Sequence, residues 1–129
     1  MTGLDLDHVA IAVPNLIEAI ALYESLSGGS ATEAETLPEQ GVRVAFVGSI
    51  ELLEPLGPDT PVGRFVSRRG PGVHHIAYHT TDVAGELARM VAAGFEAIDR
   101  VPRREARGHL VAFLHPRTTG GTLIELVGR

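Results

Sequence analysis

The apolar positions of this 129-residue chain follow two different periods, which alternate along the sequence. Close to the N-terminus, apolar residues alternate with small or polar ones over 8–13, a period of two that is typical of a half-buried strand. The Pro-Asn pair at 14–15 then predicts a helix start. Apolar side chains recur at helical spacing from Leu16 onwards, and the glycines at 28–29 predict the end of that helix.

The second half of the chain repeats this order. A strand is predicted at 73–78, and Thr81 or Asp82 can cap a helix that begins at Val83 and ends at Gly94. Further short strands are predicted near 31–37, 42–47 and 50–54, and again near 96–101, 109–114 and 122–127.

A comparison of the chain with itself supports a duplicated unit. A shift of 67 residues lays 6–11 over 73–78, 16–27 over 83–94 and 44–47 over 111–114. A shift of 74 lays 50–53 over 124–127, which leaves extra residues in the loop around 115–121. The halves are joined by a Pro- and Gly-rich stretch at 55–72, which is expected to carry a short helix at 62–68.

Each half therefore reads as strand, helix, strand, strand, strand. We predict an α+β fold in which two tandem βαβββ modules form a curved mixed sheet. A helix covers only one face of such a small sheet, so the other face meets the sibling module or encloses a ligand. The length fits a single domain, residues 1–129, with module one at about 4–56 and module two at about 71–129.

Two histidines and two glutamates hold equivalent places in the two halves. His8 alternates with residues that should pack under the helix, so it points to the opposite face, and His75 holds the same place. Glu51 and Glu125 each lie between two apolar residues and also leave the helix-packed face. If the halves pair about a pseudo-two-fold axis, these four side chains converge.

Imidazole and carboxylate groups together suit Zn²⁺, Fe²⁺, Co²⁺, Ni²⁺ or Mn²⁺ and are too rich in nitrogen for Ca²⁺. Two neutral histidines and two carboxylates neutralise a divalent ion and leave open positions for a bidentate ligand. The competing interpretation is structural, because a single strand histidine is commonly a hydrogen-bonded residue and a single strand glutamate a solvent-facing charge. The symmetry of the four positions favours the metal site.

Composition removes several other chemistries. The chain has no Cys and no Lys, which excludes thiolate metal sites, cysteine nucleophiles, Schiff-base lysines and phosphate-binding P-loops. With 16 acidic residues against 11 Arg, nucleic acid is not the expected partner. No apolar run has the length of a membrane span and no basic N-terminal region resembles a signal peptide, so we expect no membrane partner and a cytoplasmic location.

Six segments carry a resemblance to a known family. They are LDHVAIAV at 6–13, PEQGV at 38–42, IELLEP at 50–55, GVHHIA at 72–77, FLHP at 113–116 and GGTLIEL at 120–126. On these segments the chain resembles the vicinal oxygen chelate superfamily, which includes the glyoxalases and bleomycin resistance proteins, and within it the methylmalonyl-CoA epimerase family. The resemblance spans nearly the whole chain.

The resemblance implies a glyoxalase-like fold around a central metal, held by His8, His75 and Glu125, with Glu51 as a fourth ligand where some relatives have Gln. It implies metal-dependent epimerisation of (2R)- and (2S)-methylmalonyl-CoA, in which a proton leaves the α-carbon and the metal stabilises the enolate. Glu39 is the implied acid/base and Glu125 a second candidate. Co²⁺ is the expected ion, with Zn²⁺, Mn²⁺, Ni²⁺ and Fe²⁺ as alternatives. Acyl-CoA is the expected substrate and a homodimer the expected assembly.

Other functions remain open on the same positions. His8, His75 and Glu125 also fit the facial triad of an Fe(II) extradiol dioxygenase, and a glyoxalase-type isomerase or lyase shares the fold. A metal-free protein that sequesters small molecules would be expected to lose the ligands. Side-chain charge for the coenzyme A phosphates must come from Arg, and there are two candidate clusters: Arg100, Arg103, Arg104 and Arg107, and Arg64, Arg68 and Arg69.

Overall fold

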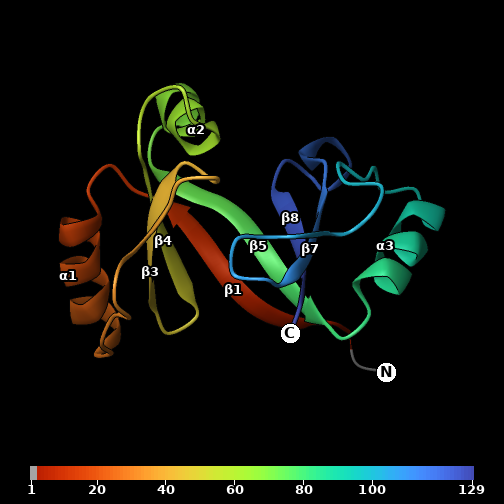
Figure 1. The fold of residues 1–129 in the computed structure, drawn as a ribbon, viewed down its shortest axis with the longest axis horizontal. Coiled ribbons are helices and arrows are strands. Elements are labelled where there is room, and N and C mark those ends of the chain that lie inside the picture. The colour runs from red at the N-terminus through yellow and green to blue at the C-terminus, as the bar shows by residue number, and fades with distance from the viewer. Residues whose placement is uncertain (1–2) are drawn as a thin grey trace. The chain divides into compact units, whose positions relative to one another are not determined.

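The structure is a computed structural model that describes residues 3–129, and two βαβββ repeats account for most of its elements (Figure 1). In chain order the elements are β1 (Asp5–Ala12), α1 (Leu16–Ser27), β2 (Glu35–Leu37), β3 (Val42–Val47), β4 (Ile50–Pro55), α2 (Pro61–Arg69), β5 (Gly72–Thr80), α3 (Val83–Ala92), β6 (Arg103–Arg104), β7 (Leu110–Leu114), the 3-10 turn η1 (Pro116–Thr118) and β8 (Leu123–Gly128). The predicted α+β fold with tandem βαβββ modules is confirmed. Among the described residues, no helix is long and apolar enough to cross a membrane.

The contacts group the chain into two compact units. Unit 2 comprises Val9–His74, and unit 1 comprises His75–Arg129 together with the described residues up to His8. The first residues of β1 therefore belong with the second repeat. The expected single domain and its two module ranges stay a prediction.

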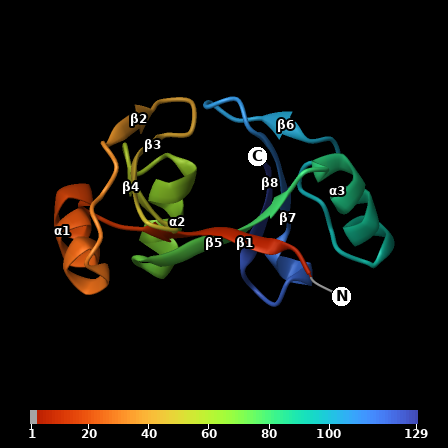
Figure 2. The ribbon, with the colours of Figure 1, turned by 90° about the horizontal axis from the view of Figure 1, so that it is seen from below.

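In unit 2, β1 pairs in parallel with β4, and β3 and β2 continue the sheet in antiparallel pairing. Figure 2 shows β2 beside β3. Helix α1 packs on β3 and β4, and its Leu16 is buried in one cluster with Leu52. Helix α2 packs against the opposite face of β4, where Val62 shares a cluster with Leu53.

Unit 1 has the same construction. β5 pairs in parallel with β8, and β7 and β6 follow in antiparallel pairing. Helix α3 packs on β7 and β8, and its Leu87 is buried in one cluster with Leu126. The other face of this sheet carries a smaller cluster that includes Ala77 and Val111.

The strand register repeats between the units and explains the shifts found in the sequence. In unit 2, Glu51 on β4 pairs with Ala10 on β1 and with Phe46 on β3. In unit 1, the corresponding residues are Glu125 on β8, Ala77 on β5 and Phe113 on β7. Each unit thus places a glutamate at the equivalent position of its own strand ladder.

The helix limits follow local signals closely. The Asn15 side chain caps α1 by accepting the Glu18 N–H, and Gly28 ends that helix at a φ of 77°. Asp82, one of the two predicted caps, accepts the Gly85 N–H at the start of α3. α2 spans Pro61–Arg69, close to the expected short helix.

Two strand predictions are wrong in extent. At 96–101 the structure has only an isolated bridge between Ala97 and Leu114, and β6 is confined to Arg103–Arg104. At 31–37 it has an isolated bridge at Ala31 followed by the three-residue β2. Both segments run along a sheet edge with few ladder bonds.

A side chain replaces part of the ladder at the first of these segments. The carboxylate of Asp99 accepts the backbone N–H of Phe113 at 2.9 Å, so β7 bonds to a side chain where a neighbouring strand would supply a carbonyl. Pro102 has no N–H to donate to a sheet. Regular pairing resumes only at Arg103, which lies opposite Val111.

Candidate metal centre

Three side chains of the type that binds metals meet inside unit 1. His8 Nε2 lies 3.3 Å from His75 Nε2 and 3.4 Å from Glu125 Oε1. His75 Nε2 lies 3.1 Å from the same carboxylate oxygen. All three residues are buried. The parallel pairing of β5 with β8 and the first residues of β1 bring them together.

The triangle of donor atoms has the size that one metal ion requires. Bonds from a metal to nitrogen or oxygen are about 2.0–2.2 Å long, so neighbouring donors lie about 3.0 Å apart in an octahedron and about 3.4 Å apart in a tetrahedron. The three separations are 3.3, 3.4 and 3.1 Å. Two imidazoles and one carboxylate thus form a set that fits a divalent transition metal.

Glu125 is held in its ionised form. Burial by itself would raise the pKa of this carboxyl, but hydrogen bonds and positive charge from His75 and His8 outweigh burial and lower its pKa to about 2. The group is therefore a carboxylate at neutral pH. The ionised carboxylate is the form that binds a metal ion.

Asp7 and Arg129 extend the cluster behind His8. Asp7 Oδ2 lies 2.6 Å from His8 Nδ1, and Arg129 Nε donates to Asp7 Oδ1 at 2.7 Å. Burial raises the pKa of Asp7, but the hydrogen bonds from His8 and Arg129 lower it overall. The sequence pattern does not predict this contact. Asp7 is an ordinary member of the strand alternation, and Arg129 lies 122 positions away from it.

The two consecutive histidines of β5, His74 and His75, contact different aromatic residues. The His75 ring meets the edge of Phe113, with ring centroids 5.8 Å apart. His74, one residue earlier, packs instead against Phe65 of α2 within unit 2, at 4.9 Å. The alternation of strand faces therefore holds, and His74 has a packing role.

Glu51, the predicted fourth ligand, is a buried carboxylate on β4 of unit 2. It pairs with Ala10, which lies two residues after His8 and so on the same face of β1. Glu125 has the same relation to β5. This equivalence supports Glu51 as a ligand, which stays a prediction.

Glu39, the predicted acid/base, is exposed in the turn between β2 and β3. Two backbone hydrogen bonds close that turn: the Gln40 N–H donates to Leu37 O and the Gly41 N–H donates to Pro38 O, both at 3.1 Å. The carboxylate is thus carried at the tip of a fixed turn. Its role in proton transfer stays a prediction.

The predicted Arg cluster at 100–107 is largely committed to local contacts. Arg103 forms an ion pair with Asp99 at 3.0 Å and lies over the Phe113 ring. Arg104 donates to the carbonyl of Gly108 at 2.7 Å. These contacts hold the β6–β7 connection, so these two guanidiniums are not freely available to a phosphate group.

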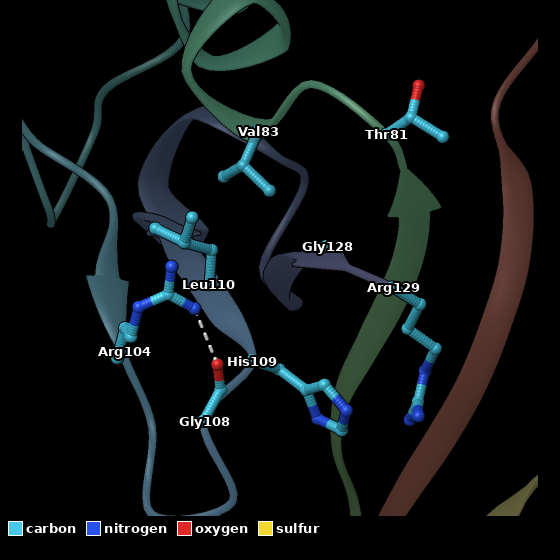
Figure 3. Close-up of a pocket in the computed structure, with 8 residues that line it drawn as sticks. All are labelled: Thr81, Val83, Arg104, Gly108, His109, Leu110, Gly128 and Arg129. Atoms are coloured by element: carbon cyan, nitrogen blue, oxygen red, sulfur yellow. Dashed lines mark hydrogen bonds between the residues drawn. The ribbon is translucent and has the colours of Figure 1, made fainter.

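Arg104 also borders a cavity of about 440 Å³ in unit 1. Figure 3 shows Arg104 and Arg129 on opposite sides of this cavity in that view, with His109 between them. Leu110 and Val83 also line it. Arg104 is engaged with Gly108 and Arg129 with Asp7, and through Arg129 this cavity adjoins the group of residues behind His8.

Comparison with known proteins places the chain in a family. Residues 7–113 match the glyoxalase/bleomycin resistance protein/dioxygenase superfamily. The chain belongs to this superfamily. The predicted resemblance and the glyoxalase-like fold are thereby confirmed.

The chain is also similar to individual proteins, among them named epimerases. The uncharacterised protein YqjC of Bacillus subtilis (strain 168) is 42% identical over 125 residues, which cover 94% of this chain and 89% of YqjC. The ethylmalonyl-CoA/methylmalonyl-CoA epimerase of Cereibacter sphaeroides is 38% identical over 127 residues, which cover 94% of this chain and 95% of the relative. A variant of Streptomyces coelicolor methylmalonyl-CoA epimerase, solved with 2-nitronate-propionyl-CoA, has a TM-score of 0.87 at 34% identity and covers 98% of this chain and 95% of its own.

Proposed function

We propose that this protein interconverts (2R)- and (2S)-methylmalonyl-CoA by moving the proton on the α-carbon. The observation that carries the proposal is the buried triangle of His8, His75 and Glu125. It occurs in a chain that is 38% identical to a named epimerase over nearly its whole length. The site therefore supports the function in addition to the fold, which alone would be insufficient.

The ligand set is suited to stabilising negative charge. A divalent ion, for which we propose Co²⁺, would act as a Lewis acid toward the thioester oxygen of the substrate. His8, His75 and Glu125 would hold that ion, with Glu51 as the fourth ligand. Two neutral imidazoles and two carboxylates would balance the charge of a divalent ion and leave open positions at which the substrate could bind through two oxygens.

Epimerisation needs one group that removes the proton and one that returns it from the other face. Glu39 is proposed as the first of these groups, because its carboxylate stands on a turn of fixed shape. Glu125 is the second candidate.

Deuterium exchange at C2 of methylmalonyl-CoA in D₂O tests the proposal directly. We expect the metal-loaded protein to exchange the C2 proton and a chelator to abolish the exchange. Glu39→Gln should slow exchange by roughly 10²–10⁴-fold, as expected for loss of a general base. Glu33→Gln, which changes another exposed glutamate of unit 2, is the matched control. A metal-loaded wild-type protein that exchanges no deuterium rejects the epimerase.

The same triangle also fits a second candidate function, an Fe(II) extradiol dioxygenase, because two histidines and one carboxylate form a facial triad for that ion. This candidate requires oxygen consumption when the Fe²⁺-loaded protein receives a catechol. An oxygen electrode measures it. Absence of uptake, together with C2 exchange, assigns the site to the epimerase.

Three finer points accompany the proposal. Coenzyme A thioesters are the proposed substrate class, and ethylmalonyl-CoA belongs in the substrate panel because the Cereibacter relative is named for it. A homodimer is the proposed assembly, which light scattering on the purified protein measures. The cytoplasmic location stays a prediction.

A further inference from the structure

Both ring nitrogens of His8 face groups of different chemistry. Nε2 points into the triangle with His75 and Glu125, whereas Nδ1 lies 2.6 Å from Asp7 Oδ2. A neutral imidazole carries one N–H and one lone pair, and an ionised carboxylate can only accept. Asp7 therefore holds the N–H of His8 at Nδ1 and leaves the Nε2 lone pair for a metal.

Arg129 fixes the carboxylate that makes this selection. Its Nε donates to Asp7 Oδ1 at 2.7 Å, so the two carboxylate oxygens serve different partners. With both oxygens engaged, the carboxylate cannot rotate without breaking a charge-assisted hydrogen bond. The guanidinium also offsets the negative charge of Asp7, so the pair adds little net charge beside the triangle.

The second half of the chain carries a different residue at the position of Asp7. The residue equivalent to Asp7 in the second half is His74, whose ring packs on Phe65. His75 is flanked by Phe113. Local duplication therefore does not account for the carboxylate behind His8, and its contact with Arg129 joins residues from opposite ends of the sequence.

We propose that Asp7 and Arg129 are positioning residues that fix His8 as an Nε2 metal ligand. The inference rests on the proposed metal centre, but it concerns metal affinity and not the reaction. Without the carboxylate, the His8 ring can carry its proton on Nε2 or rotate, and either change removes one corner of the triangle. Without Arg129, the carboxylate keeps its charge but loses its fixed direction.

Titration of the metal-free protein with Co²⁺ in a calorimeter tests whether Asp7 and Arg129 position His8. Removing a carboxylate that orients a ligand histidine costs about 10–100-fold in metal affinity, and we expect that loss for Asp7→Ala. Asp7→Asn, which restores an acceptor oxygen without the charge, should lose less, and Arg129→Gln less again. Asp5→Asn changes an exposed carboxylate on the same strand and should bind Co²⁺ as the wild type does.

Nitrogen-15 NMR of the zinc-loaded protein supplies a readout that a purely structural role would leave unchanged. We expect a hydrogen-bonded Nδ1–H on His8 in the wild type and in Asp5→Asn, and loss of that signal in Asp7→Ala. If Asp7→Ala does not fold, Asp7→Asn and Arg129→Gln carry the same comparison.

The positioning role is overturned if all three variants bind Co²⁺ within twofold of the wild type and the His8 signal is unchanged. The proposed metal centre fails by a different result, which is Co²⁺ binding that survives in both His75→Ala and Glu125→Gln.

Discussion

The two units of this protein share one backbone register and differ in what surrounds it. In each unit a glutamate pairs with an alanine of a parallel neighbour, Glu51 with Ala10 and Glu125 with Ala77. In unit 1 two histidines contact the glutamate and a second carboxylate contacts one of these histidines, whereas unit 2 combines a buried Glu51 with an exposed Glu39 on a turn.

The difference shows that register and chemistry are set separately. Strand pairing decides which side chains leave the helix-packed face, and both units obey it. The neighbours then decide what the position does: Asp7 stands before His8, whereas His74 stands before His75 and packs on an aromatic ring. A duplicated scaffold can therefore keep its ladder and still give its two halves different tasks.

The largest effect is expected when the two glutamates are exchanged for glutamine one at a time. Glu125→Gln removes the charged corner of the triangle, so Co²⁺ affinity should fall by roughly 100-fold or more, beyond the usual cost of losing an orienting group. Glu51→Gln should cost about tenfold or less, because an amide oxygen still ligates. Calorimetric titration measures both. Equal losses would contradict the smaller contribution expected from Glu51.

A pair of core substitutions tests whether the two scaffolds are equally important for stability. Leu52 and Leu126 occupy equivalent strand positions and are both 0% exposed. Truncation to alanine should lower the free energy of unfolding by about 2–5 kcal/mol in each case. Urea denaturation measures the losses, with exposed Leu22→Ala as control. A large inequality between Leu52→Ala and Leu126→Ala would show that one unit governs stability.

Acid should weaken unit 1 through Glu125. Its pKa falls from 4.5 in the unfolded reference to about 2 in the fold, so its stabilising contribution is complete above pH 4.5 and disappears as the pH falls toward 2. The contribution has an upper limit of about 3 kcal/mol. Urea denaturation of metal-free protein at several pH values should show the difference from Glu125→Gln shrinking over this window. A constant difference would refute the assignment.

The smallest effect is expected at the loop that only the second repeat contains. Arg117 donates two hydrogen bonds to Glu96, at 3.0 and 2.9 Å, and these lower the pKa of that exposed carboxyl. In Arg117→Gln the pKa of Glu96 should return toward its usual value, as followed by NMR. Unfolding and Co²⁺ affinity should stay unchanged, because exposed ion pairs contribute little. Altered Co²⁺ affinity would connect this loop to the metal centre.

Short-range signals made much of the molecule predictable. The period of two placed His75 and Glu125 on the face away from α3, and caps and glycines marked the ends of α1. These features depend on residues within a few positions of one another. The comparison of the two halves then added the pairing of the histidines, because equivalent residues occupy equivalent strand positions.

Features that depend on distant residues escaped prediction. The strand expected at 96–101 gave way to an Asp99 side chain bonded to Phe113, which no local pattern announces. The contact of Asp7 with Arg129 spans 122 positions, so the sequence offers no period that connects them. The role proposed for Glu39 was predicted from the family resemblance and not from periodicity, because this residue lies in a turn and has no counterpart in the second half.

The turn that carries Glu39 is wedged against the start of α2. Gly41 adopts a φ of 69°, and a Cβ there would lie 2.7 Å from the Thr60 side chain, which itself caps α2. Leu56 N–H also donates to Gly41 O at 2.8 Å. The backbone entropy of this turn is therefore lost once, during folding. Proton transfer by Glu39 would then require only rotation of its side chain, which takes picoseconds to nanoseconds. The turn would not have to become ordered in every reaction cycle.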